Sequence, residues 1–99
     1  MQKGQEAKKA NTQQRETELK ELNARIDILE SKVEKAATDA QVRYREQIAE
    51  LKKKRNHLRE KIDELRASGS EAWKDLKQGV AEAAKELRNA LDAASKRFQ

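Results

Sequence analysis

The 99-residue sequence has no cysteine and no proline, and it contains only three glycines, three aromatic residues and one histidine. The absence of cysteine excludes disulfides, thiolate nucleophiles and cysteine-ligated zinc. His57 has no second histidine or cysteine nearby to share a metal ion, and no glycine-rich phosphate loop or serine with an adjacent general base is present. We therefore expect no catalytic residue, no cofactor and no metal site, and a protein that is not an enzyme.

Long hydrophobic runs are also missing, because no three consecutive residues are apolar. The N-terminal residues 1–6 lack the apolar stretch of a signal peptide, and no segment is apolar enough to cross a bilayer. The sequence thus predicts a cytoplasmic protein.

Charged residues make up 41% of the chain and hydrophobic residues 35%, many of them alanine. A conventional globular core cannot be built from so little apolar material in so short a chain. The prevailing residues are Ala, Glu, Lys, Leu, Arg and Gln, which are strong helix formers. This composition predicts an all-α coiled-coil protein.

Large apolar residues recur three and four positions apart, the spacing of a coiled-coil seam. One run extends from Leu19 to Val33 and a second from Ile48 to Leu65, with neither glycine nor proline between Gly4 and Gly69. The simplest interpretation is one long helix over residues 18–67. Residues 1–17 carry no apolar residue at seam spacing and are expected to form a flexible polar tail.

A turn is expected at residues 68–70, where Gly69 suits a left-handed helix cap. A second amphipathic helix over residues 71–99 should then pack back, antiparallel, on residues 40–66. In this hairpin Tyr44 would face Ala94, and Phe98 would face Ala40. The expected hairpin core consists of Tyr44, Ile48, Leu51, Leu58, Ile62, Leu65, Trp73, Leu76, Val80, Leu87, Leu91 and Phe98.

The second helix is too short to cover the first apolar run, and an apolar seam left in water is an interface. We expect a homodimer or higher homo-oligomer, or a partner protein helix, to cover the interface residues Leu19, Leu22, Ile26, Leu29 and Val33. The alternative is a break near residues 36–39 that gives a three-helix bundle, with Thr38 and Gln41 capping the restart. Because Ala36 and Ala37 favour helix and no turn residue is present, the self-associating hairpin is preferred.

The formal net charge of +5 arises within residues 42–61, which hold eight basic and three acidic residues. Such a segment can contact the phosphates of nucleic acid. The candidate phosphate contacts are Arg43, Arg45, Lys52, Lys53, Lys54, Arg55 and Arg59. No aromatic residue interleaves with them for base stacking, so nucleic-acid binding is an alternative function. Binding of the second helix to an anionic membrane surface is a second alternative.

The stretch Gly69-Ser70-Glu71-Ala72-Trp73-Lys74-Asp75-Leu76-Lys77-Gln78-Gly79-Val80, followed by Leu87, Ala90, Ala94 and the closing Ser95-Lys96-Arg97-Phe98, forms a recognisable C-terminal pattern. It resembles the small bacterial coiled-coil stress-response proteins. The resemblance implies a non-enzymatic protein associated with stress and supplies no catalytic residues. Together with the seams, it favours a structural or protective coiled-coil protein that acts through self-association or partner binding.

Overall fold

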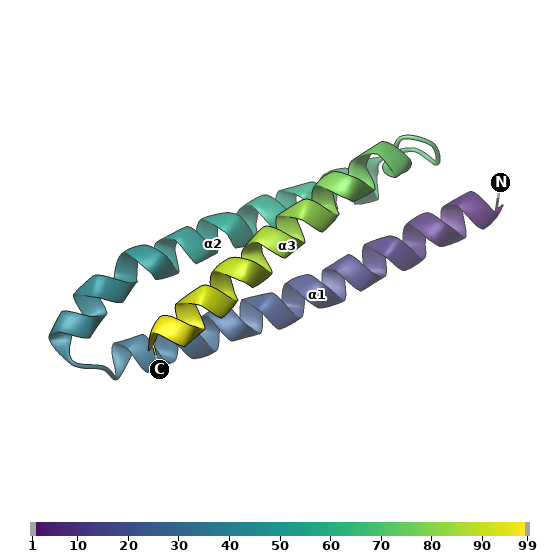
Figure 1. The fold of residues 1–99 in the computed structure, drawn as a ribbon. Coiled ribbons are helices and arrows are strands. Elements are labelled where there is room, and N and C mark those ends of the chain that lie inside the picture. The colour runs from purple at the N-terminus through teal and green to yellow at the C-terminus, as the bar shows by residue number, and fades with distance from the viewer. Residues whose placement is uncertain (1, 99) are drawn as a thin grey trace.

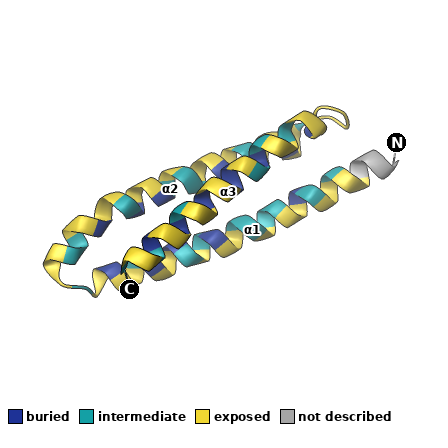
Figure 2. Ribbon diagram, viewed as in Figure 1, coloured by how far each residue is buried: buried dark blue, intermediate teal, exposed yellow. Residues whose placement is uncertain are grey.

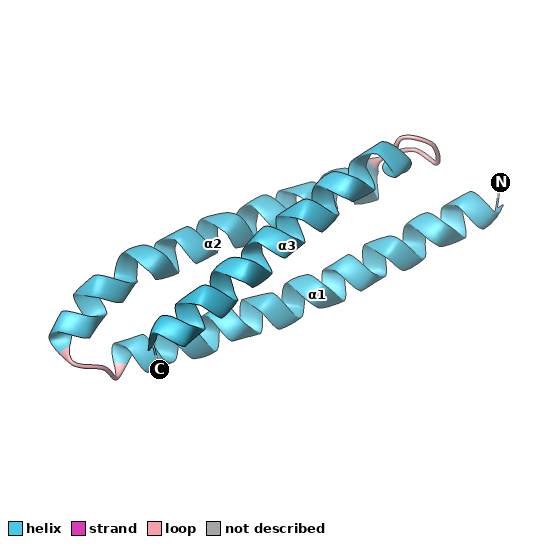
Figure 3. Ribbon diagram, viewed as in Figure 1, coloured by secondary structure: helices cyan, strands magenta, loops and turns pink. Residues whose placement is uncertain are grey.

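The computed structural model of the protein describes residues 2–98, with side chains from residue 6 onward. Three helices follow one another in this part of the chain: α1 (Gln2–Glu34), α2 (Thr38–Ala67) and α3 (Trp73–Phe98) (Figure 1). The all-α class is confirmed, and the alternative three-helix bundle is the arrangement found. The expected helix over residues 18–67 is wrong, because the chain leaves the helix at residues 35–37 and reverses (Figure 3).

The helices form an elongated bundle of 56 × 18 × 16 Å. The tight reversal after α1 makes α2 antiparallel to it, and a second reversal makes α3 run in the same direction as α1 (Figure 1). The C-terminal end of α3 therefore lies beside the C-terminal end of α1, and the turn between α2 and α3 lies towards the N-terminal end of α1.

The buried residues form stripes along the inner faces of the helices, while the outer faces are exposed (Figure 2). This pattern follows from the three-and-four spacing, which places apolar side chains on one face of each helix. The core contains Leu22, Ile26, Leu29, Val33, Tyr44, Ile48, Leu51, Leu58, Ile62, Leu65, Trp73, Val80, Ala83, Ala84, Leu87, Leu91 and Ala94. Leu19, Leu76 and Phe98 are partly buried against it.

Burial of the first apolar run explains why the long helix breaks. Leu22, Ile26, Leu29 and Val33 are at most 4% exposed within a single chain. Each fully buried leucine or isoleucine contributes about 1.5 to 3 kcal/mol, which exceeds the cost of ending a helix at Ala36 and Ala37. The reason for expecting a second chain over these residues is thereby removed.

The expected polar tail over residues 1–17 is also different in the structure, since α1 already begins at Gln2. The helix formers in this stretch continue the helix even though they add no large apolar side chain to the core. Residue 1 of that segment, and residue 99 of the expected second helix, lie outside the described residues.

The turn between α2 and α3 occupies residues 68–72 and is two residues longer than expected. Ser68 adopts an extended conformation (φ −72°, ψ 155°), and its hydroxyl donates a hydrogen bond to the Leu65 carbonyl at 2.6 Å. No glycine in the described chain has a positive φ, so the left-handed cap expected at Gly69 is wrong.

The longer turn shifts the register of α3 along α2 by about one helical turn, as seen where the C-terminal end of α3 lies beside the start of α2. Tyr44 packs against Phe98 with the ring centroids 5.0 Å apart and the rings nearly perpendicular, instead of facing Ala94. Its hydroxyl donates a hydrogen bond to the Arg97 carbonyl at 2.6 Å. Aromatic contact and hydrogen bond together fix the C-terminal end of α3 on α2.

Candidate functional site

The spacing of the apolar run in α1 continues towards the N-terminus with polar residues. Four, three and four positions before Leu19 come Arg15, Thr12 and Lys8, which occupy the same face of the helix. We call Lys8, Asn11, Thr12 and Arg15 the polar seam, and Leu19, Leu22, Ile26, Leu29 and Val33 the apolar seam. A single helix thus docks on the α2–α3 hairpin through two halves of opposite chemistry.

The residues of the polar seam are buried or half-buried, but their polar atoms are incompletely hydrogen-bonded. Thr12 is 7% exposed, and its hydroxyl donates to the Lys8 carbonyl at 2.8 Å. Arg15 donates from Nη1 to Glu18 at 2.7 Å. Within the described residues, however, Asn11 Oδ1 and Arg15 Nε are buried and have no hydrogen-bond partner. Each such atom costs about 1 to 3 kcal/mol, so this half of α1 docks weakly.

The polar seam lies at the turn end of the hairpin. Lys8 donates to the Ser68 carbonyl, and Arg66 pairs with Glu16 at 2.7 Å. On α3, Arg88 pairs with Glu18, so Val80, eight residues earlier in a parallel helix, is level with the polar seam. Val80 is fully buried there. Polar side chains of α1 are therefore level with a buried apolar side chain of α3.

Packing at this end leaves space. A surface cavity of about 500 Å³ opens between α1 and the turn. It is lined by Lys8, Lys9, Thr12, Gln13, Glu16, Arg66, Ser68, Gly69 and Ser70. Trp73, the first residue of α3 after the turn, is only 5% exposed. Its indole Nε1 is buried and has no hydrogen-bond partner among the described residues. The turn end is thus the least well satisfied part of the core.

The second half of α1 docks with both apolar and charged contacts. Arg25 pairs with Asp92 on α3 at 2.7 Å, and Glu30 pairs with Lys52 on α2 at 2.6 Å. These side chains are partly exposed, where an ion pair contributes at most about 1 kcal/mol. The apolar seam beneath them supplies most of the docking energy, and the ion pairs set the register.

The pKa of the Arg66 guanidinium is shifted upward. The main cause is the hydrogen bond that it donates to Glu16, followed by the negative charge of the same carboxylate. Because Arg66 is exposed, the pair contributes to the position of α1 at the turn end more than to stability.

The hinge, which we define as residues 35–37, joins α1 to α2 without glycine or proline. Ala37 is extended (φ −59°, ψ 153°) and offers no side chain to cap α2. Gln41 caps the preceding helix, because its Nε2 donates to the carbonyls of Glu34 at 2.7 Å and Ala36 at 3.2 Å. Gln41 thus closes the end of α1, a different role from the expected capping of α2.

The candidate phosphate contacts lie on two sides of α2. Lys52 and Arg55 turn towards α1, where Lys52 pairs with Glu30 and Arg55 donates to Asn23 at 2.9 Å. Lys54 lies on the opposite side, in a groove with Ala90 and Ala94 of α3. Lys53 is paired with Glu50 along the same helix at 3.7 Å, and Arg43, Arg45 and Arg59 are exposed. The structure does not bring these residues together into one cluster.

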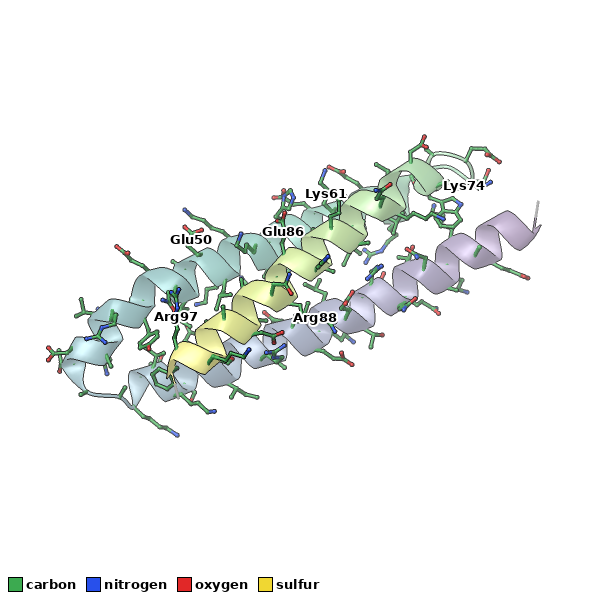
Figure 4. All side chains as sticks on the ribbon, in the orientation of Figure 1. Glu50, Lys61, Lys74, Glu86, Arg88 and Arg97 are labelled. Carbon is green, nitrogen blue, oxygen red and sulfur yellow. The ribbon has the colours of Figure 1, made fainter. Side chains whose placement is uncertain are left out.

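Charged side chains of both signs cover the outer faces of the three helices (Figure 4). Within residues 2–98 no group of three or more histidine, aspartate or glutamate side chains is placed to hold a metal ion. None of the three helices over these residues combines the length and apolarity that a membrane span requires.

Comparison of the chain with protein-family models, with curated proteins and with solved structures found no match. The resemblance of residues 69–98 to the stress-response proteins therefore remains a prediction.

Two features escaped the sequence reasoning. The polar seam was signalled by the unbroken three-and-four spacing before Leu19, but polar residues at these positions suggested a free tail. The Gln41 cap was not identifiable, because it depends on a chain reversal that no turn residue marks.

Proposed function

We propose that this chain is a non-enzymatic, structural or protective helical protein that acts through helix–helix association. The binding surface is the turn end of the α2–α3 hairpin, and the ligand is an amphipathic helix of a partner protein. The proposal rests on one observation: polar side chains of α1 lie level with buried Val80 of α3, and two of their buried atoms, Asn11 Oδ1 and Arg15 Nε, have no hydrogen-bond partner among the described residues.

The energetics favour replacement of the N-terminal part of α1 by a partner helix at the turn end of the hairpin. A partner helix with leucine at the positions of Lys8, Thr12 and Arg15 would gain roughly 5 to 9 kcal/mol from three buried side chains. The polar seam of α1 offers no comparable gain, so its undocking costs little. Its tether, however, keeps α1 at an effective concentration of about millimolar, which holds the bundle closed until such a helix is present.

A protein that covers exposed apolar helices would protect the proteins that contain these helices from aggregation. This agrees with the stress association that the resemblance of residues 69–98 implies. Nucleic-acid binding receives less support, because the basic residues are divided between two sides of α2 and some pair with carboxylates. Membrane binding by α3 also receives less support, because Val80, Leu87 and Leu91 are fully buried in the closed bundle.

The test uses a labelled peptide of residues 2–34 that carries Lys8→Leu, Thr12→Leu and Arg15→Leu. In fluorescence anisotropy titrations it should bind the full-length protein at least about tenfold more tightly than the unsubstituted peptide does, since each buried leucine adds about 1.5 kcal/mol or more. The matched control is a full-length variant with the same three substitutions, whose own α1 should exclude the labelled peptide.

Equal binding of the labelled peptide to the wild type and to the substituted variant would contradict the proposal, because the peptide would then bind outside the α1 site. A blue shift of Trp73 emission with anionic vesicles, but no peptide binding, would favour the membrane alternative instead.

A further inference from the structure

The hinge reverses the chain without the residues that usually do so. It consists of Lys35, Ala36 and Ala37, and alanine is the strongest helix former. The closed hinge also leaves the last carbonyls of α1 and the first amides of α2 without helical partners. At the hinge the Ala36 amide donates to the Val33 carbonyl at 3.1 Å, and Gln41 donates to the carbonyls of Glu34 and Ala36. No hydrogen bond from a described side chain caps the first amides of α2.

A straight hinge would satisfy these backbone groups by joining α1 and α2 into one helix. It would also uncover the apolar seam, which cannot remain in water. The surface that fits this seam is the one that already buries it, the α2–α3 hairpin. In an opened chain that surface is available on a second copy.

From the hinge and the seam together we infer that the chain forms a domain-swapped dimer, in which α1 of each copy docks on the α2–α3 hairpin of the other. This inference rests on the proposed function, because it names a second copy as one partner of the hairpin surface. The contacts that α1 makes with the hairpin away from the hinge re-form between the chains, including Arg25 with Asp92 and Glu30 with Lys52. Only the hinge differs, as expected for domain swapping.

The geometry is consistent with a symmetric dimer. In the closed chain α1 and α2 are antiparallel and paired by Glu30 with Lys52 and by Glu16 with Arg66. Two straightened helices would pair in the same way about a twofold axis near the hinge. Each continuous helix over residues 2–67 would be roughly 100 Å long, compared with 56 Å for the longest dimension of the closed chain.

Two substitutions at the hinge should shift the equilibrium between the closed monomer and the swapped dimer in opposite directions. Thr38 is the first residue of α2, where proline is favoured, and the extended conformation of Ala37 suits a residue before proline. In a continuous helix the same proline would be interior and would break it. Thr38→Pro should therefore lower the dimer-to-monomer ratio at least about a hundredfold, given the cost of an interior proline. Gln41→Ala should raise the ratio about tenfold, because it removes hydrogen bonds made only in the closed hinge.

The experiment measures the mass of the full-length protein by light scattering after incubation at micromolar and at millimolar concentrations. We expect a concentration-dependent dimer for the wild type, more dimer for Gln41→Ala, and single chains for Thr38→Pro. Circular dichroism of Thr38→Pro, which should match the wild type in helix content, verifies that this variant folds. Single-chain mass for the wild type and Gln41→Ala at every concentration would overturn the inference.

Cross-linking distinguishes the swap from side-by-side association. Because the chain has no cysteine, the variant Arg25→Cys/Asp92→Cys carries one thiol on α1 and one on α3. A short bismaleimide should join the two thiols within a chain in the monomer and between chains in the isolated dimer. Cross-links only within chains in the dimer fraction would exclude the swap.

The labelled peptide described above separates this inference from the proposed function. Binding of the peptide to Thr38→Pro, combined with a wild type that never dimerises, would refute the swap and leave the helix-binding surface intact. If the protein forms a swapped dimer but binds no peptide, the swap is supported and the proposed function is refuted. The hairpin surface would then bind only α1 of this protein.

Discussion

Burial in this bundle changes abruptly between neighbouring residues. Ile26 is completely buried, whereas Ile28, two positions later in α1, is 57% exposed. Two residues along a helix correspond to a rotation of about 200°, which moves a side chain from the core to solvent. The same residue type in the same helix therefore has two different energetic roles.

Ile26→Ala should lower the free energy of unfolding by about 2 to 5 kcal/mol, because it leaves a cavity in the core. The matched substitution Ile28→Ala should change it by less than about 0.5 kcal/mol, as is usual for an exposed site. Urea denaturation followed by circular dichroism measures both values. Similar losses for the two variants would mean that the face of α1 towards the hairpin is misassigned.

At the scale of the helix, α3 has the most distinct apolar face and also an interior glycine. Gly79 lies in the second turn of α3, and a Cβ placed on it would have nothing within 4 Å. No close approach of another helix requires glycine at this position. Its effect is confined to the lower helix propensity of glycine relative to alanine.

Gly79→Ala should therefore raise the free energy of unfolding by about 0.5 to 1 kcal/mol. The reverse substitution at an exposed alanine of the same helix, Ala93→Gly, should lower it by a similar amount. Thermal and urea unfolding of the pair give the comparison. A loss of stability in Gly79→Ala would reveal a steric role for this glycine.

At the scale of the whole molecule, the two ends of the bundle differ in how they are held. At the hinge end, Tyr44 packs on Phe98 and donates a hydrogen bond to the Arg97 carbonyl. The apolar seam of α1 also belongs to this half of the bundle. The turn end has the polar seam and the indole Nε1 of Trp73, which has no hydrogen-bond partner among the described residues. Stability should accordingly decrease along α1 towards its N-terminus.

Hydrogen exchange measured by mass spectrometry tests this gradient. Backbone amides in residues 6–15 should exchange at least about tenfold faster than those in residues 22–33, because the polar seam itself adds no large apolar side chain to the core. The variant with leucine at positions 8, 12 and 15 should slow exchange in the first segment only. Uniform protection along α1 in the wild type would remove the basis for helix exchange at the turn end.

The accuracy of the sequence-based prediction depended on the range of the interaction concerned. The inner positions from Leu22 to Leu91 followed from helical periodicity, a local property. Arg15 and Thr12 lay on the same periodic face, but without large apolar side chains they carried no signal of burial. The break at Ala36 and Ala37 opposed local propensity, so only long-range packing could reveal it.

The sequence by itself determined the all-α class, the faces of the helices that turn inward and the turn after Leu65, because helix propensity and apolar spacing act over a few residues. The tertiary structure decided that α1 folds back on its own hairpin, that the polar seam is covered, and that Gln41 closes the hinge. These outcomes depend on the free energy of burying one helix against two others far away in the sequence. That energy exceeds the local preference of Ala36 and Ala37 for helix.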